Sequence, residues 1–375
     1  MEICFLKKIY FSLSVILFAL YFTPAVNAEF FKILIEIWPL VGCVLILFDK
    51  NINILKTNSF LLFFLLIIFS ILTVSNGVRR DELLVLFIIY ILFSNENPKS
   101  VIRIFSITIV SFLLITTVLS AVGMLPNYTH LRDVSDLTSV RRAFIFNHSN
   151  QYGLITFSAY LSSLIYLKNS NRKIKNSLFL IGLLLTGYIL FYIDSKTSAL
   201  CILFATLLFK FYDVLRTYNC KRTILLLNRT SFLFIPLFYI FSLISTFLYD
   251  NNYAILNLLN KLLTGRIYLQ NKAVTSLGIP MFGQLLTNGD AYVDSFYIQS
   301  IFNYGLLPFT LIIICVSFMI YKFSKHNQLS CIFAVVFLIG IIGISEPVCL
   351  NIVVNPYLIF LMIKISQLEN KCFIL

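Results

Sequence analysis

Charge is scarce in this sequence. Only 12% of its 375 residues are charged, whereas 59% are hydrophobic. Apolar runs longer than about 17 residues recur from end to end, and each is long enough to be considered for a membrane-spanning helix. No polar stretch is long enough to form a separate soluble domain. The composition therefore excludes a soluble enzyme and predicts an all-α integral membrane protein, a single multi-pass membrane domain over residues 1–375.

Paired cysteines are also lacking. The eight cysteines lie in apolar runs or on the predicted inner side, and their positions show no paired spacing. This pattern argues against a disulfide scaffold and against a zinc site. We expect the cysteines to pack as small apolar side chains.

About twelve transmembrane helices account for the apolar runs. The predicted spans are residues 9–26, 30–48, 58–75, 82–94, 101–122, 151–167, 177–193, 198–212, 231–249, 296–320, 330–349 and 352–365. The fourth, eighth and twelfth are shorter than the roughly 20 residues that a spanning helix needs, so tilted or partial elements remain an alternative for them.

Basic residues fix the predicted orientation. Lysines and arginines concentrate in alternate loops, most clearly at residues 168–175 and 210–229. By the positive-inside rule both termini lie in the cytoplasm. The two longest loops, 124–150 and 250–295, are then extracytoplasmic. The same bias accounts for the net charge of +13, so no nucleic-acid partner is expected.

Residues 1–28 allow a second interpretation. Lys7 and Lys8 precede an apolar core, and Val26-Asn27-Ala28 has the small residues of a signal-peptide cleavage site. A retained first helix is the simpler interpretation, because the basic loops then alternate without adjustment. Cleavage after residue 28 stays open.

The first extracytoplasmic loop ends in a cluster of polar side chains. Arg141 and Arg142 are followed by His148 and Asn150, and Gly153 lies in the first turn of the next predicted span. Unsatisfied N–H groups at a helix start favour anions, and the arginine fork suits phosphate oxygens. These residues predict an anion site, with arginine binding to lipid head groups as the alternative.

The second loop carries Arg266 and ends at Asp294, where the tenth span begins. Within that span Ser295, Gln299 and Asn303 share one helix face. Such a polar stripe faces either a wet cavity or another helix, to which it hydrogen-bonds. Most of the other outer acidic residues, a group that includes Glu346, fit plain loop solvation.

Several of these segments resemble Wzy-type polysaccharide repeat-unit polymerases, relatives of the O-antigen ligases. Arg142 through Gly153 resembles their Arg-x10-Gly loop motif, and Asp194-Ser195-Lys196-Thr197-Ser198-Ala199-Leu200 resembles their Ser-Arg-Thr-Ala-Leu turn with lysine in place of arginine. The large loop and the following helix are matched in order by Thr264-Gly265-Arg266-Ile267, Phe282-Gly283, Val293-Asp294-Ser295-Phe296-Tyr297 and Asn303-Tyr304-Gly305-Leu306.

The resemblance covers residues 120–310 and has two departures. Gly278 follows Arg266 one residue too late to repeat the Arg-x10-Gly spacing. Asp294-Ser295 stands where the ligases carry His-Asn. The first departure weakens the symmetry between the two loops, and the second favours a polymerase over a ligase.

The resemblance implies a metal-independent membrane glycosyltransferase in the bacterial cytoplasmic membrane, with no cofactor. It would join undecaprenyl-diphosphate-linked oligosaccharide repeat units into O-antigen, capsule or another exopolysaccharide at the outer face. Its partners would be that lipid-linked oligosaccharide, the bilayer, and a chain-length regulator and flippase of the same pathway. O-antigen ligase-type transfer and a lipid-linked oligosaccharide flippase or transporter remain the alternatives.

The resemblance also implies roles for individual residues. Arg142 and Arg266 would bind the diphosphates, with Arg141 and Lys196 as secondary cations. Asp294 would accept the proton of the acceptor hydroxyl, and His148 is the second candidate for this base. The sugar cavity would be lined by Asn150, Tyr292, Gln299 and Asn303.

Overall fold

The structure is a computed structural model. It describes residues 2–24, 29–49, 81–93, 96–133, 136–168, 170–250, 253–263, 265–284, 293–325, 332–347, 351 and 353–357. The predicted span 58–75, most of the predicted span 352–365 and the candidate residue Tyr292 lie outside these residues, as does the possible cleavage site at residues 26–28.

The described elements fall into two compact units. The prediction of one multi-pass domain stays a prediction, and each unit is described by itself.

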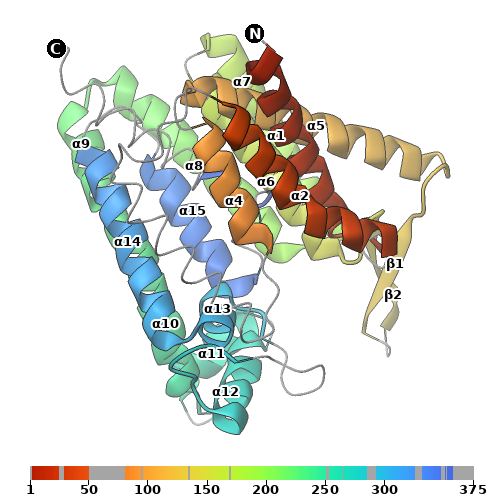
Figure 1. Cartoon of the computed structure of the whole chain (residues 1–375). Helices are drawn as coiled ribbons and strands as arrows, with labels where there is room; N and C mark the ends of the chain where they lie inside the picture. The colour runs from red at the N-terminus through yellow and green to blue at the C-terminus, as the bar shows by residue number, and fades with distance from the viewer. Residues whose placement is uncertain are drawn as a thin grey trace. The chain divides into compact units, whose positions relative to one another are not determined.

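The first unit is a helical bundle with a β-hairpin. It contains α1 (Glu2–Leu20), α2 (Glu29–Phe48), α4 (Asp81–Phe93), α5 (Pro98–Ala121), β1 (Tyr128–Asp133), β2 (Asp136–Phe144), α6 (Ser149–Leu167), α7 (Arg172–Tyr188), the π-helix η3 (Ile189–Ile193) and α8 (Lys196–Thr217). Helix α1 packs on α5, and α2 packs on α4 (Figure 1).

Helix α6 lies at the centre of the first unit. It contacts α5, α7 and α8, and most of its side chains are buried, including Ser158 and Ser162. The hydroxyl of Tyr160 lies 2.9 Å from Thr206 Oγ1 and so joins α6 to α8. A helix that is buried on nearly all sides has no lipid-facing stripe. Some of its hydroxyl groups bond to carbonyl groups of α6 itself, as Ser162 Oγ does to Ala159 O, and others bond to neighbouring helices.

The second unit contains α9 (Lys221–Thr230), the 3-10 helix η4 (Ser231–Leu233), α10 (Phe234–Phe247), α11 (Ala254–Leu262), α12 (Arg266–Leu277), α13 (Phe296–Tyr304), α14 (Leu306–Lys325) and α15 (Ile332–Ser345). Helix α10 packs on α12, α13, α14 and α15. Aromatic rings fill this contact: the Phe234 ring meets Phe333 and Phe337 edge-on, at centroid distances of 5.0 and 5.2 Å. The short helices α11, α12 and α13 gather near one end of α10 (Figure 1).

Six helical segments among the described residues are long and apolar enough to cross a membrane: Ile3–Leu20, Glu29–Phe48, Pro98–Ala121, Arg172–Ile193, Lys196–Thr217 and Lys221–Phe247. Helices α14 and α15 are shorter apolar elements, and α6 does not belong to the set of six. The chain is therefore a largely helical, membrane-embedded protein, whereas the count of twelve spans and the orientation stay predictions.

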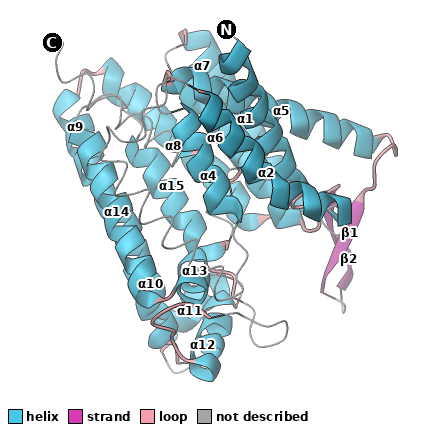
Figure 2. Ribbon diagram, viewed as in Figure 1, coloured by secondary structure: helices cyan, strands magenta, loops and turns pink. Residues whose placement is uncertain are grey.

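Two elements differ from the predicted pattern. Residues 124–150 are not only loop: β1 and β2 pair there as an antiparallel hairpin (Figure 2), so the described chain is not purely α-helical. The predicted span 296–320 is not one helix, because it breaks at Gly305 into α13 and α14. Gly305 has a φ of +94°, which a side-chain-bearing residue rarely adopts.

Candidate functional site

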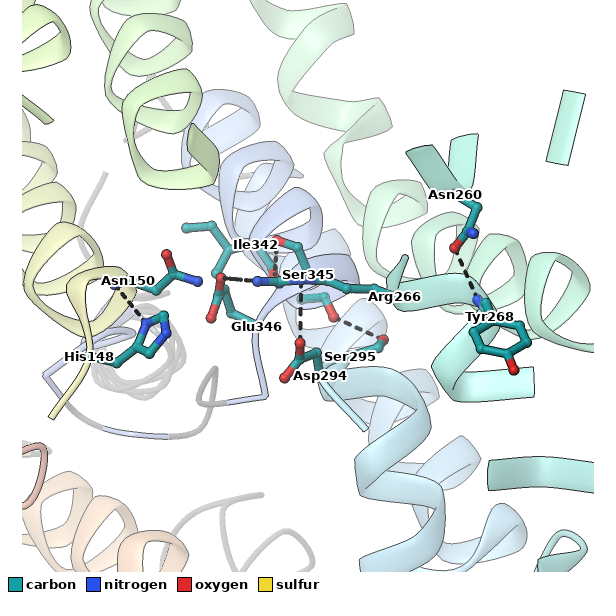
Figure 3. A network of polar contacts seen from close by, with 11 residues as sticks. His148, Asn150, Asn260, Arg266, Tyr268, Asp294, Ser295, Ile342, Ser345 and Glu346 are labelled. Carbon is teal, nitrogen blue, oxygen red and sulfur yellow. Dashed lines mark hydrogen bonds and ion pairs between the residues drawn. The ribbon is translucent and has the colours of Figure 1, made fainter. Parts of the chain in front are cut away.

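Arg266 lies between two carboxylates in the second unit (Figure 3). Its Nη1 and Nη2 both donate to Glu346 Oε1, each at 3.1 Å. Its Nε lies 3.4 Å from Asp294 Oδ2. We call Arg266, Asp294 and Glu346 the arginine–carboxylate cluster.

A sharp corner in the chain positions Arg266. Helix α11 ends at Leu262, and Gly265 then takes the left-handed conformation, with a φ of +85°, before α12 begins at Arg266. The Gly265 N–H donates to Asn260 O at 2.8 Å, and the Tyr268 N–H donates to Asn260 Oδ1 at 3.0 Å (Figure 3). Because Arg266 is the first residue of α12, the positive end of that helix adds to its attraction for anions.

Packing against α15 holds Asp294 beside Arg266. Asp294 directly precedes Ser295, the N-cap residue of α13. Ser295 Oγ donates to Gly343 O at 3.2 Å, and the Tyr297 hydroxyl donates to Gly340 O at 3.3 Å. The start of α13 is thus fastened to the end of α15, and Glu346 follows one residue beyond that end.

Burial governs the electrostatics of the cluster. Arg266 is 8% exposed and Glu346 is 6% exposed. Burial raises the pKa of the Glu346 carboxyl to about 7, although Arg266 acts in the opposite direction; the negative charge of Asp294 adds to the rise. A carboxyl that titrates near neutral pH can both hold and accept a proton there.

Two backbone segments lie in close contact at the break between α13 and α14. A Cβ on Gly305 would meet the backbone of Met281, Phe282 and Gly283, and a Cβ on Gly283 would meet the backbone of Asn303. The Gln284 N–H donates to Phe302 O at 2.6 Å. The segments Phe282-Gly283 and Asn303-Tyr304-Gly305, which were matched separately in the sequence, therefore lie backbone to backbone.

The predicted polar stripe includes one residue that bonds to a neighbouring helix. Ser295 is buried and bonded to α15, which is interhelical hydrogen bonding. Asn303 is buried as well, and Gln299 is half-buried on the same helix. Both stay candidates for the sugar cavity.

In the first unit, Arg141 and Arg142 lie on β2 and contact the end of the π-helix. Arg141 Nε lies 3.0 Å from Asp194 Oδ2. The Arg142 guanidinium carbon lies 4.0 Å from the centre of the Tyr192 ring, which is a cation–π contact. Tyr188 and Tyr192 stack on each other at 5.2 Å. Both arginines are therefore held by side chains of η3 and the turn after it.

Gly153 brings two of the matched motifs together. A Cβ at this position would lie 2.7 Å from both Ser195 Oγ and Ser198 Oγ and 2.8 Å from Ser198 Cβ. The glycine of the Arg-x10-Gly motif thus lets α6 approach the start of α8. Lys196, the first residue of α8, is exposed beside this contact.

His148 and Asn150 form the start of α6. His148 is the N-cap residue, and its Nδ1 accepts a hydrogen bond from the Asn150 N–H at 3.2 Å (Figure 3). That bond uses the atom that would otherwise accept a proton. His148 therefore has a structural role in capping α6, and Asp294 stays the first candidate for the base.

Sequence reasoning missed two features of these sites. Glu346 was interpreted as a solvated loop residue, which is wrong because it is buried against Arg266. The signal that was available was its position at the edge of a strongly apolar run, where an acidic side chain needs a partner. The π-helix at Ile189–Ile193 was also missed, because its pattern does not differ from that of an α-helix.

No protein-family model, curated protein or solved structure matches this chain. The fold and the described sites define a membrane-embedded helical protein with a buried arginine–carboxylate cluster.

Proposed function

We propose that this protein polymerises undecaprenyl-diphosphate-linked oligosaccharide repeat units into a surface polysaccharide at the outer face of a bacterial cytoplasmic membrane. The observation that supports it best is the arginine–carboxylate cluster. Arg266 and Asp294, which the resemblance assigns to diphosphate binding and to proton removal, lie 3.4 Å apart through Nε and Oδ2.

The chemistry needs these two groups. A hydroxyl oxygen of the acceptor unit attacks the anomeric carbon of the donor chain, and the bond from that carbon to the diphosphate oxygen breaks. Undecaprenyl diphosphate leaves with the electron pair of that bond, and the Asp294 carboxylate takes the hydroxyl proton. Arginine stabilises the negative charge that develops on the leaving diphosphate.

Residues of the first unit have further roles in this proposal. Arg142 binds diphosphate, Arg141 and Lys196 add positive charge, and Asn150 contacts sugar. Arg142 already lies over an aromatic ring, which fixes its side chain and lowers the entropic cost of binding a phosphate.

Polysaccharide length on a gel tests the proposal. In a host from which the gene is deleted, we expect the wild-type gene to restore a ladder of chain lengths. Asp294→Asn, which keeps the shape and removes the charge, should lower polymer formation roughly 100-fold or more, as loss of a general base does. The amount of protein in the membrane is measured for each variant.

Asp213→Asn is the matched control. Asp213 Oδ1 forms an ion pair with Lys175 Nζ at 2.8 Å between α7 and α8, and neither residue has a role in the proposed chemistry. We expect its ladder to equal the wild type. An unchanged ladder in Asp294→Asn would refute the role of Asp294. Repeat units trapped inside deletion cells would indicate a flippase, and full-length chains left on their carrier would indicate a ligase.

A further inference from the structure

The arginine–carboxylate cluster has more negative than positive charge. Arg266 contributes one positive charge, and Asp294 and Glu346 contribute two negative charges when both are ionised, so the sum is −1. Glu346 Oε1 also accepts from both terminal nitrogens of Arg266, the same nitrogens with which an arginine fork binds phosphate. An anion therefore meets a cluster of its own sign, in which both terminal nitrogens of Arg266 already donate to a carboxylate.

One proton removes both obstacles. When Glu346 is protonated, the cluster is neutral and its hold on the guanidinium weakens, because a neutral carboxyl attracts arginine less than a carboxylate does. We propose that binding of a diphosphate at Arg266 is coupled to uptake of one proton from solvent by Glu346. This inference deepens the proposed function and rests on it, since it assigns to Glu346 the control of substrate binding.

The surroundings of Glu346 limit which groups act on it. Arg266 of α12 and Asp294 ahead of α13 are the charged groups whose interaction with the Glu346 carboxyl shifts its pKa. Helix α10, which packs along α15, contains no Asp, Glu, Lys, Arg or His, and neither does α13. The basic residues of α9 lie near the other end of α15, because Phe234 at the start of α10 contacts Phe333 at the start of α15.

The titration range supports the coupling. Burial raises the pKa of Glu346 to about 7, so its protonation changes near neutral pH. Below that pH the carboxyl is already protonated and anion affinity should not depend on pH. Above it, each binding event must take up a proton, so affinity falls as pH rises and approaches a tenfold loss per pH unit.

Anion binding to the purified full-length protein in lipid nanodiscs tests the coupling. The probe is the symmetrical dimethyl ester of diphosphate, because a diester keeps one negative charge on each phosphate between about pH 5.5 and about pH 8.5. Calorimetry gives the Kd across this range. For the wild type we expect a constant Kd at low pH and a rise toward tenfold per unit above neutrality.

Two variants test whether Glu346 is the group that takes up the proton. Glu346→Gln cannot take up a proton, so its Kd should stay within about threefold of the low-pH wild-type value at every pH. Asp294→Asn removes the neighbouring negative charge that raises the Glu346 pKa, so its rise in Kd should begin at lower pH. Thermal unfolding in the same nanodiscs confirms that each variant is folded.

A pH-independent Kd in the folded wild type would overturn the inference, and this result needs no variant. A full pH dependence retained in Glu346→Gln would also overturn it, because another group would then take the proton. Polymer made by a protein whose Kd is pH-independent refutes only the coupling. Coupled binding without polymer in the gel assay refutes only the polymerase.

Discussion

Gly153 shows what a single missing side chain permits. A Cβ there would overlap the hydroxyls of Ser195 and Ser198, so any larger residue must separate α6 from the start of α8. Arg141 is bonded to Asp194 in the turn just before Ser195. The packing at Gly153 therefore also fixes the partner of a predicted cation.

Gly153→Ala should lower the free energy of unfolding by about 1–3 kcal/mol, because an added methyl group in a packed contact forces its neighbours apart. It should also weaken the polysaccharide ladder through displacement of the Asp194 turn. Unfolding is measured in detergent, alongside polymer length.

Gly187→Ala in α7 is the matched control, since a Cβ there has no neighbour within 4 Å. It should be neutral or slightly stabilising, because alanine favours a helix over glycine by about 1 kcal/mol. Equal losses in both variants would mean that the Gly153 contact is not tight.

Residue chemistry was predictable from the sequence where it depended on local signals. Arg266 and Asp294 stood out because they are charged residues in the second loop of an apolar chain, and Asp294 lies where a predicted span begins. Glu346 did not, because its partner lies 80 residues away and only the packing of α12 and α13 on α15 brings them together. Tyr292 lies outside the described residues, and its role stays a prediction.

At the scale of elements, hydropathy located most described helices and missed their irregularities. The predicted spans 30–48 and 101–122 correspond to α2 and α5 within a few residues. The β-hairpin was not predicted, because its strands are polar and lie in a loop between helices. The predicted span 296–320 is divided at Gly305, since the chain from Pro280 to Gln284 packs against the break.

Gly305→Ala and Gly278→Ala separate backbone strain from packing. Both glycines have positive φ, +94° and +71°, so both variants should lose about 1–3 kcal/mol of stability through strain. A Cβ on Gly305 also meets backbone atoms, whereas none lies within 4 Å of a Cβ on Gly278. We expect Gly305→Ala to be clearly less stable in thermal unfolding, and equal losses would contradict the packing role.

At the scale of the whole molecule, the chain divides into two units although its composition is uniform. Hydropathy distinguishes apolar segments from polar ones, so it predicts where helices lie in the sequence. It does not predict which helices pack together into a unit. The twelve predicted spans include one that lies wholly outside the described residues, at 58–75. The orientation, with both termini in the cytoplasm, depends on basic loops alone.

Reporter fusions test that orientation. Alkaline phosphatase fused after Asn127 should be active, because the loop 124–150 is predicted to be extracytoplasmic. Fused after Asn219, in the basic segment between α8 and α9, it should be inactive, and green fluorescent protein should give the opposite pattern. The reverse result at both positions would place the proposed site on the cytoplasmic side.

The burial of α6 has a consequence for biogenesis. With many hydroxyl groups and no lipid-facing stripe, α6 partitions poorly into hydrocarbon as an isolated segment. It gains partners such as Thr206 only when α8, which is synthesised later, is present. We therefore expect α6 to enter the membrane more readily together with the following helices than alone.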